Sequence, residues 1–144
     1  MTGVEIDLVV TDSLKALELY EKIFETERIE VSNLPRGENE AVFTLYGVQF
    51  HMLDENPQFH LIAPKPDDPK TSWVNVTVPD IKETYKKAMD LGCTEIQPVT
   101  EMADYGVSNA IFMDPFGYVW MLHQVHKEVS HEERLQLWEE KREN

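Results

Sequence analysis

The hydrophobic and polar positions near the N-terminus alternate strictly before they change to a helical spacing. Residues 4–10 read Val-Glu-Ile-Asp-Leu-Val-Val, which is typical of a strand with one buried face. Thr11-Asp12-Ser13 then offers candidates for a helix N-cap. Apolar residues follow at helical spacing, namely Leu14, Leu17, Tyr20, Ile23 and Phe24. We therefore predict a strand and then an amphipathic helix that ends near Glu25.

Three β-rich stretches follow this helix. The first spans residues 29–34, alternates apolar and polar positions, and stops at Pro35-Arg36-Gly37. The next two cover residues 40–46 and 48–53, with a glycine between them. Residues 1–54 are therefore predicted to form one βαβββ module.

Residues 55–71 differ in composition from what precedes them. They hold four prolines and the run Asp67-Asp68, so they are predicted to form a connector between two halves of the chain. Within the connector, the apolar stretch 59–62 is consistent with a short strand.

The pattern of the first module then restarts over residues 72–125. Residues 73–78 form a β-branched stretch, Pro79-Asp80 offers a helix cap, and Gly92 is a natural helix stop. The remaining predicted strands lie around residues 95–99, 107–113 and 118–125.

The two halves can be aligned with each other. Val10-Thr11-Asp12 matches Val78-Pro79-Asp80, since each ends a strand and opens a helix. Residues 47–53 match residues 117–123 at nearly the same offset. Internal duplication explains this order of elements, and it predicts an α+β fold of two βαβββ modules in a pseudo-two-fold arrangement around a central cleft.

Residues 126–144 form a tail after the second module. Ser130 and Glu133 are spaced as a capping box, and Leu135 and Trp138 lie within one turn of the predicted helix. A helix this short is marginal alone, so it is expected to dock on its own sheet or on a partner subunit. The alternative is a solvated charged helix anchored by Trp138.

The charge of the chain restricts its partners. The 144 residues contain 27 acidic and 13 basic side chains, for a net charge of −14. Nucleic acids and anionic membranes need clustered Lys and Arg, so neither is expected as a partner. The sequence contains no apolar run of membrane-spanning length and no signal-peptide pattern, so we expect a cytoplasmic location. Cys93, the single cysteine, is expected to be a small buried residue rather than a reactive thiol.

The order of elements and one motif identify a family resemblance. Residues 114–120 read Asp-Pro-Phe-Gly-Tyr-Val-Trp and precede the last strand. With the doubled βαβββ pattern, residues 4–125 resemble the vicinal oxygen chelate superfamily, which includes glyoxalase I, bleomycin- and fosfomycin-resistance proteins and extradiol dioxygenases. The aromatic residue after the proline, Trp120, and residues 53–57 are most similar to its PhnB-like branch.

The resemblance implies where a divalent metal would sit. Catalytic members of the superfamily hold the metal with residues on the first and last strands of each module, at positions that correspond here to Glu5, His51, Trp73 and Met121. Glu5 and His51 could bind a hard or borderline cation, whereas an indole cannot ligate and a thioether suits soft metals. Two ligands fall short of the usual three, so we expect no metal and no other cofactor. Asp7, Asn75 and His123 share the same sheet face by alternation, and one of them could complete a shifted site.

Alternation also predicts which side chains line the cleft. Trp73 and Met121 are expected to face it, with Phe50 and Trp120 on the opposite face against the helices. Trp73 either fills the cleft or forms one wall of a pocket for a planar apolar or cationic ligand. The remaining pocket candidates are Asp7, Asn75 and His123, with Glu5 and His51 as candidate catalytic residues. His60, His126 and His131 are expected to be surface residues.

Three functions remain open on these grounds. The leading hypothesis is a homodimer that binds or sequesters a small molecule without a catalytic metal, in the manner of bleomycin-resistance proteins. The alternative is a lyase, isomerase or dioxygenase that uses a divalent metal or Glu5 and His51 as acid and base. The third is an interaction protein whose cleft is filled. A phosphonate ligand is not expected, because Arg28 and Arg36 are not predicted to face the cleft.

Overall fold

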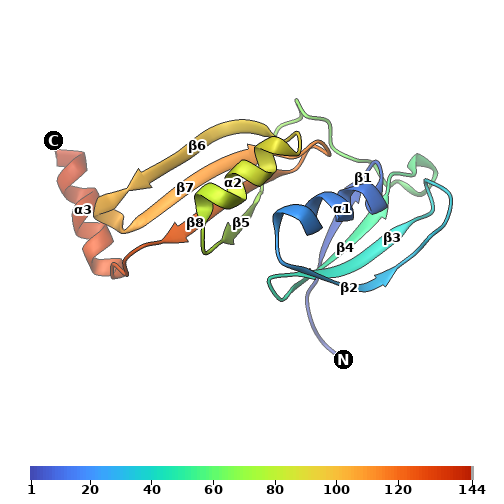
Figure 1. Ribbon diagram of the computed structural model, residues 1–144, viewed down its shortest axis with the longest axis horizontal. Helices are drawn as coiled ribbons and strands as arrows, with labels where there is room; N and C mark the ends of the chain where they lie inside the picture. The colour runs from blue at the N-terminus through green and yellow to red at the C-terminus, as the bar shows by residue number, and fades with distance from the viewer. Residues whose placement is uncertain (144) are drawn as a thin grey trace.

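The computed structural model describes residues 1–143 and shows the two-module α+β fold (Figure 1). The first module consists of β1 (Ile6–Val10), α1 (Ser13–Ile23), β2 (Thr26–Val31), β3 (Glu40–Leu45) and β4 (Val48–Asp54). The second consists of β5 (Val74–Thr77), α2 (Ile81–Asp90), β6 (Thr94–Met102), β7 (Val107–Met113) and β8 (Val119–Val125). A final helix, α3, runs from His131 to Glu143. The fold predicted from the sequence is therefore confirmed.

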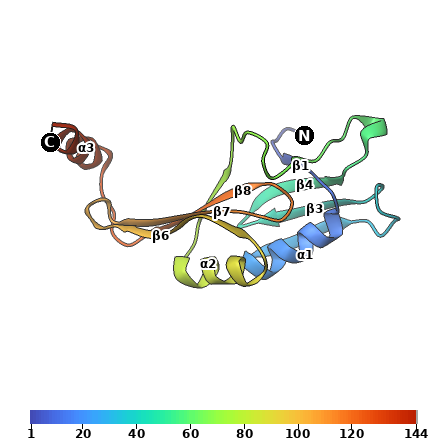
Figure 2. The same ribbon diagram turned by 90° about the horizontal axis from the view of Figure 1, so that it is seen from above.

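The two sheets have the same topology. Their strand orders are β1-β4-β3-β2 and β5-β8-β7-β6, and in each the first strand pairs parallel to the last. Figure 2 shows α1 and α2 on the same side of the two sheets, with the N-terminal residues and the connector on the other side. Each sheet therefore has one face covered by a helix and one open face.

An aspartate caps the helix at the same point in both modules. Asp12 accepts a hydrogen bond from the backbone N–H of Lys15 at 3.1 Å, and Asp80 accepts one from Glu83 at 3.1 Å. Both aspartates have extended backbone conformations, as N-cap residues do. The strand-to-helix junctions recognised in the sequence are thus stabilised by the same contact.

The hydrophobic core is continuous across the two modules. Trp120 of β8 is fully buried, and its ring centroid lies 5.0 Å from that of Tyr20 and 5.1 Å from that of Phe24, both in the first module. Phe50 of β4 belongs to the same cluster, with its ring centroid 6.4 Å from that of Trp120. The prediction that Phe50 and Trp120 pack on the helix-covered faces is confirmed.

A buried carboxylate ties this aromatic cluster together. Asp114 accepts hydrogen bonds from the hydroxyl of Tyr20 at 2.6 Å and from the indole N–H of Trp120 at 2.8 Å. The backbone N–H groups of Phe116 and Tyr118 donate to its other oxygen at 2.8 and 3.0 Å. Burial raises the pKa of Asp114, and the four donors oppose that rise without cancelling it. Tyr20 and Trp120 come from different modules, so Asp114 links the two halves.

Some local predictions were wrong. Residues 59–62 do not form a strand, because Pro57–Phe59 is a short 3₁₀ helix and Leu61 makes only an isolated bridge with Asn56. The stretch predicted at 29–34 is β2 at Thr26–Val31, with an irregular register between Arg28 and Glu30 that breaks the alternation. β6 extends to Met102, beyond the predicted end.

The C-terminal helix lies beyond the ends of β6 and β7, far from the first module (Figure 1). Ser130 caps it, since its hydroxyl accepts from the backbone N–H of Glu133 at 3.1 Å and donates to that side chain. Trp138 is 63% exposed, so the helix does not bury it on the sheet of its own chain as described for residues 1–143. Asn144, the last residue of the predicted tail, lies outside the described residues.

Cys93 is buried, as predicted. Burial, with a smaller effect of the nearby Asp114 carboxylate, raises the pKa of its thiol to about 12. Within residues 1–143, none of the helices has the length and apolar character needed to cross a membrane.

A second buried carboxylate organises the first module alone. Asp54, at the end of β4, accepts from the backbone N–H groups of Ser13, Gly37 and Asn39 at 2.7, 2.8 and 3.0 Å. Burial alone would raise the pKa of Asp54, but these backbone donors outweigh it and lower the pKa below its ordinary value. Asp54 thereby fixes the start of α1 and the loop before β3.

We predict that Asp114→Ala lowers the free energy of unfolding by about 3 kcal/mol, because it leaves the buried Tyr20 hydroxyl and Trp120 N–H without their acceptor. Urea denaturation followed by tryptophan fluorescence measures the loss. Asp67→Ala, which removes an exposed carboxylate from the connector, is the control and should stay within about 0.5 kcal/mol of the unsubstituted protein. Equal effects of the two substitutions would contradict the role assigned to Asp114.

The lowered pKa of Asp54 predicts how the stability of the protein changes with pH. Because its folded-state pKa is lowered, its contribution to stability is fully present above the unfolded value of about 3.9 and is lost as the pH falls through the folded value. The stability gap between the unsubstituted protein and Asp54→Asn should therefore be wide at neutral pH and narrow in acid. Urea midpoints at both pH values measure it, with Asp67→Asn as the charge-matched control. A gap that does not change with pH would refute the assignment.

Candidate functional site

The open face of the first sheet brings three predicted site residues together. Asp7 of β1 is the register partner of His51 of β4, and Glu5 immediately precedes β1. Alternation places all three opposite the buried positions of the same strands. The donor atoms of Glu5, Asp7 and His51 lie within 4.8 Å of one another.

His51 lies between carboxylates on both sides of its ring. Its Nδ1 is 3.4 Å from Oε1 of Glu5 and 3.7 Å from Oδ2 of Asp7. Its Nε2 is 3.0 Å from Oε2 of Glu40, which lies on β3. The imidazole is mostly buried, with 20% of the side chain exposed, whereas the carboxylates are more open. The first module therefore presents an acidic surface organised around one histidine.

Glu5 is held by a neighbour on β4. Gln49 donates a hydrogen bond from its amide Nε2 to Oε2 of Glu5 at 2.6 Å. The other oxygen of Glu5 faces His51. The carboxylate is thus oriented from behind, although Glu5 lies outside β1 itself.

The open face of the second sheet has different chemistry. Trp73, immediately before β5, is 58% exposed. Asn75 is the register partner of Met121, and Thr77 is the partner of His123. His123 is fixed by Asn109 of β7, whose Oδ1 lies 2.7 Å from its Nδ1. This face combines an exposed indole and a thioether with a few oriented polar groups.

A cavity of about 390 Å³ lies where the modules meet. Of the predicted pocket residues, Asn75 lines it. Its other lining residues are Ile6, Leu45, Tyr46, Val48, Phe50, Val74, Val76 and Thr77. The cavity is therefore mainly apolar and is bounded by β5 on one side and by β1 and β4 on the other.

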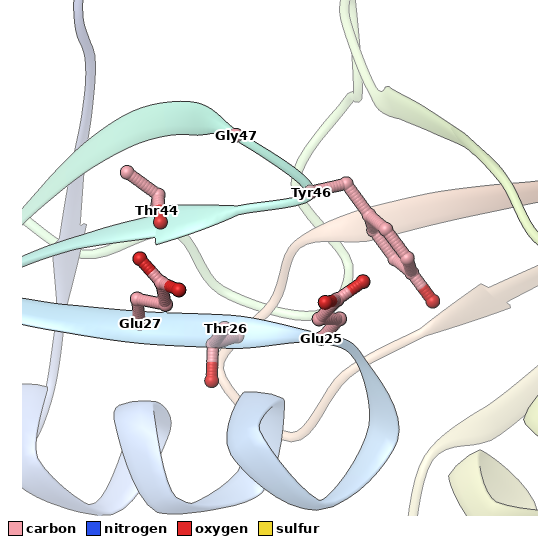
Figure 3. A pocket seen from close by; sticks show the side chains of 6 residues that line it. All are labelled: Glu25, Thr26, Glu27, Thr44, Tyr46 and Gly47. Carbon is pink, nitrogen blue, oxygen red and sulfur yellow. The ribbon is translucent and has the colours of Figure 1, made fainter.

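A second hollow, of about 280 Å³, lies at the end of the first sheet (Figure 3). Figure 3 shows Glu27 and Thr44 beside each other on β2 and β3, with Tyr46 projecting from the turn between β3 and β4. Glu25, Thr26 and Gly47 complete its lining. None of these residues was predicted for the cleft, and the hollow offers carboxylates and hydroxyls without a histidine or cysteine.

The resemblance places metal ligands at Glu5, His51, Trp73 and Met121. Together these four residues do not suit a divalent metal. Trp73 offers no ligand atom, and the thioether of Met121 is a poor ligand for the hard and borderline cations that Glu5 and His51 would bind. Within residues 1–143, the donors that converge all belong to the first module, where Asp7 is the third. The expectation that no cofactor is held stays a prediction.

The sequence reasoning missed Glu40, Gln49 and Asn109, which orient predicted site residues. The sequence did contain a signal for Glu40 and Gln49. The short turn at Tyr46-Gly47 sets the register of β3 against β4, which pairs Val42 with His51 and places Glu40 diagonally beside that histidine. Gln49 is two residues from His51 and so shares its face.

Among solved structures, the chain is similar to the fosfomycin resistance protein FosX from Listeria monocytogenes, in a complex with Mn(II) and 1S,2S-dihydroxypropylphosphonic acid. The TM-score is 0.68 at 18% identity, covering 96% of this chain and 98% of that one. The PhnB protein from Bacillus cereus gives a TM-score of 0.66 at 19% identity, covering 86% and 100% of the two chains. At these identities the likeness establishes the fold.

Comparisons of sequence identify the family. An uncharacterised protein of Mycobacterium bovis is 25% identical over 132 residues, which cover 88% of this chain and 85% of that protein. The family model for the Glyoxalase/Bleomycin resistance protein/Dioxygenase superfamily matches residues 4–122, most of both modules. The chain therefore belongs to the glyoxalase/bleomycin resistance protein/dioxygenase superfamily.

Proposed function

We propose that this protein binds a small molecule on the open faces of its two sheets, without a catalytic metal bridging the modules. The single observation that carries the proposal is Trp73, whose indole is largely exposed where active family members place a metal ligand. An exposed indole offers a large apolar surface to a planar ligand and its π-face to a cation.

The neighbours of Trp73 support a binding surface. Met121 adds a polarisable side chain on the adjacent strand, and its register partner Asn75 supplies an amide. His123 is oriented by Asn109, so its ring is held in place before a ligand arrives. A few fixed polar groups on a largely apolar wall are typical of small-molecule sites.

The charge of the first module favours a cationic ligand over an anionic one. Glu5, Asp7 and Glu40 surround His51 on the open face, in a chain of net charge −14. A phosphonate such as the ligand of the FosX complex would meet this acidic surface. Arg28 is paired with Glu21, and Arg36 donates to the carbonyl of Thr11, so both are already engaged. We therefore propose a planar ligand that is neutral or positively charged.

A homodimer forms part of the proposal. Ile6 and Val48 line the cavity between the modules and expose apolar surface, and Trp73, next to Val74 of that lining, is exposed as well. A second copy would cover this surface and close the open faces. Sedimentation equilibrium of the full chain should give a dimer mass, and a monomer at high concentration would remove this part of the proposal.

A second candidate function is an enzyme in which Glu5 and His51 act as base and acid. The observation that favours it is the contact of His51 with carboxylates on both sides of its ring. Turnover of a lyase, isomerase or dioxygenase substrate that disappears in Glu5→Gln, with the fold intact, would establish this function in place of simple binding.

We predict that the cationic planar dye thioflavin T binds this protein and that Trp73→Ala weakens the binding about tenfold, equivalent to roughly 1.4 kcal/mol. Fluorescence titration measures the Kd. The control is Trp138→Ala, which removes an equally exposed indole from α3 and should leave the Kd unchanged.

The thioflavin T titration is repeated on chelator-treated protein. A separate titration uses the anionic dye anilinonaphthalene sulfonate in place of thioflavin T. Unchanged thioflavin T binding after chelation and weaker binding of the anionic dye are expected. Binding that requires a metal, or equal effects of the two tryptophan substitutions, would overturn the proposal.

A further inference from the structure

One side of the C-terminal helix α3 rests against its own chain. The Nζ of Lys141 lies 4.7 Å from the ring centroid of Tyr105, in a cation–π contact. Leu137 is half-buried, and it lines a hollow between α3 and the end of the second sheet. The other residues that line this hollow are Ala103, Asp104, Lys127, Glu133, Gln136 and Glu140. These contacts fix which side of α3 faces inward.

The outward side of α3 carries exposed apolar side chains. Leu135 is 50% exposed and Trp138 is 63% exposed. They are three residues apart, so they are neighbours on the helix surface. At about 100° of rotation per residue, their shared face lies nearly opposite Leu137. Because α3 also lies at the far end of the molecule (Figure 1), this face is open to another chain.

The charges beside these two residues follow a heptad pattern. With Leu135 at position a and Trp138 at position d of a heptad lettered a to g, Glu132 and Glu139 occupy position e, and Arg134 and Lys141 occupy position g. Charged residues at e and g form ion pairs between helices and set their choice of partner. Neither Arg134 nor Glu139 forms an ion pair within residues 1–143, so both are available to a second helix.

The signs of these charges favour one partner in one orientation. In a parallel pair of α3 helices, position g of each helix lies beside the next position e of the other. Arg134 would then meet Glu139 of the partner subunit, and symmetry would form this ion pair twice. In an antiparallel pair, like positions lie side by side, so Glu132 would meet a glutamate and Arg134 a lysine. The pattern therefore complements a parallel second copy of α3.

We propose that α3 is a self-association surface, which pairs in parallel and in register with α3 of a second copy of this chain. Leu135 and Trp138 would form the apolar seam, and Arg134 and Glu139 the flanking ion pairs. This surface is separate from the junction of the modules, and the proposal does not depend on the proposed function. Pairing of α3 would join chains, or dimers formed at the junction, into larger assemblies.

The pairing is expected to be weak. His131 and Arg142 occupy the next d and a positions, so the apolar seam is only one heptad long. Two such short helices bury less surface than the roughly 1,600 Å² of a standard interface. Association through α3 should therefore appear at higher protein concentration than the dimer at the junction.

Sedimentation velocity of the full chain over a series of concentrations tests this proposal. The average mass of the unsubstituted protein should rise with concentration beyond the mass that Glu139→Arg reaches. Glu139→Arg and Arg134→Glu each turn both ion pairs into repulsions, so each should weaken the association more than about tenfold. Glu140→Arg is the matched control, because it makes the same change of charge on the side of α3 that faces the hollow. It should associate as the unsubstituted protein does.

Restored complementarity separates pairing from damage to the helix. The double variant Arg134→Glu with Glu139→Arg reverses both signs and should regain the association. An equimolar mixture of the two single variants should also associate, although neither does so alone, because arginines at both positions then meet glutamates at both. Circular dichroism confirms that each variant is folded.

The remaining outcomes would overturn the proposal. They are single variants that associate as the unsubstituted protein does, a mixture that stays apart, and no concentration-dependent rise in mass in any variant. Stronger association of Glu139→Arg would indicate an antiparallel pair, since its new arginine would then lie beside Glu132 of the partner subunit. Every variant keeps the residues at the junction of the modules, so a dimer formed there contributes equally to all the measurements.

Discussion

The buried carboxylate of Asp114 is the contact on which the arrangement of the two modules depends. It lies in the turn between β7 and β8, yet one of its donors is the hydroxyl of Tyr20 on α1. Trp120 donates to the same oxygen, so an indole of the second module is fixed against the helix of the first. A buried carboxylate is unfavourable unless its hydrogen bonds are satisfied, and here one side chain from each module and two backbone N–H groups of the second module satisfy it. The hydroxyl of Tyr118, which donates to the carbonyl of Val9, adds a second link across the junction.

Because this core holds both helices on one side, the two open sheet faces are presented on the other (Figure 2). The faces differ chemically although the modules share a topology. Glu5, Asp7 and His51 give the first face charge and ligand atoms, whereas Trp73 and Met121 give the second an apolar wall. A metal centre shared between the modules needs donors from both, and on the second face Trp73 offers no ligand atom and Met121 offers only a thioether.

The sequence was sufficient for the fold and for the faces of most site residues, because period-two alternation decides which side of a strand a residue occupies. Asp12 and Asp80 marked the strand-to-helix junctions, and both cap their helices. The 3₁₀ turn at Pro57–Phe59 was not predicted, since proline-rich connectors carry no periodic signal. Alternation placed Asp7 on the same sheet face as Glu5 and His51, but the pairing of Asp7 with His51 depends on the register of β1 against β4, which spacing along the chain does not supply. Asp7, Asn75 and His123 were therefore equal candidates from the sequence, and only the structure brings Asp7 within 4.8 Å of Glu5 and His51.

The proposed binding surface is tested most directly by diffraction from crystals of the full chain soaked in thioflavin T. We predict electron density for the dye against the indole of Trp73, beside Met121 and Asn75. Density for the dye only away from Trp73, for example against Trp138 of α3, would contradict the proposal.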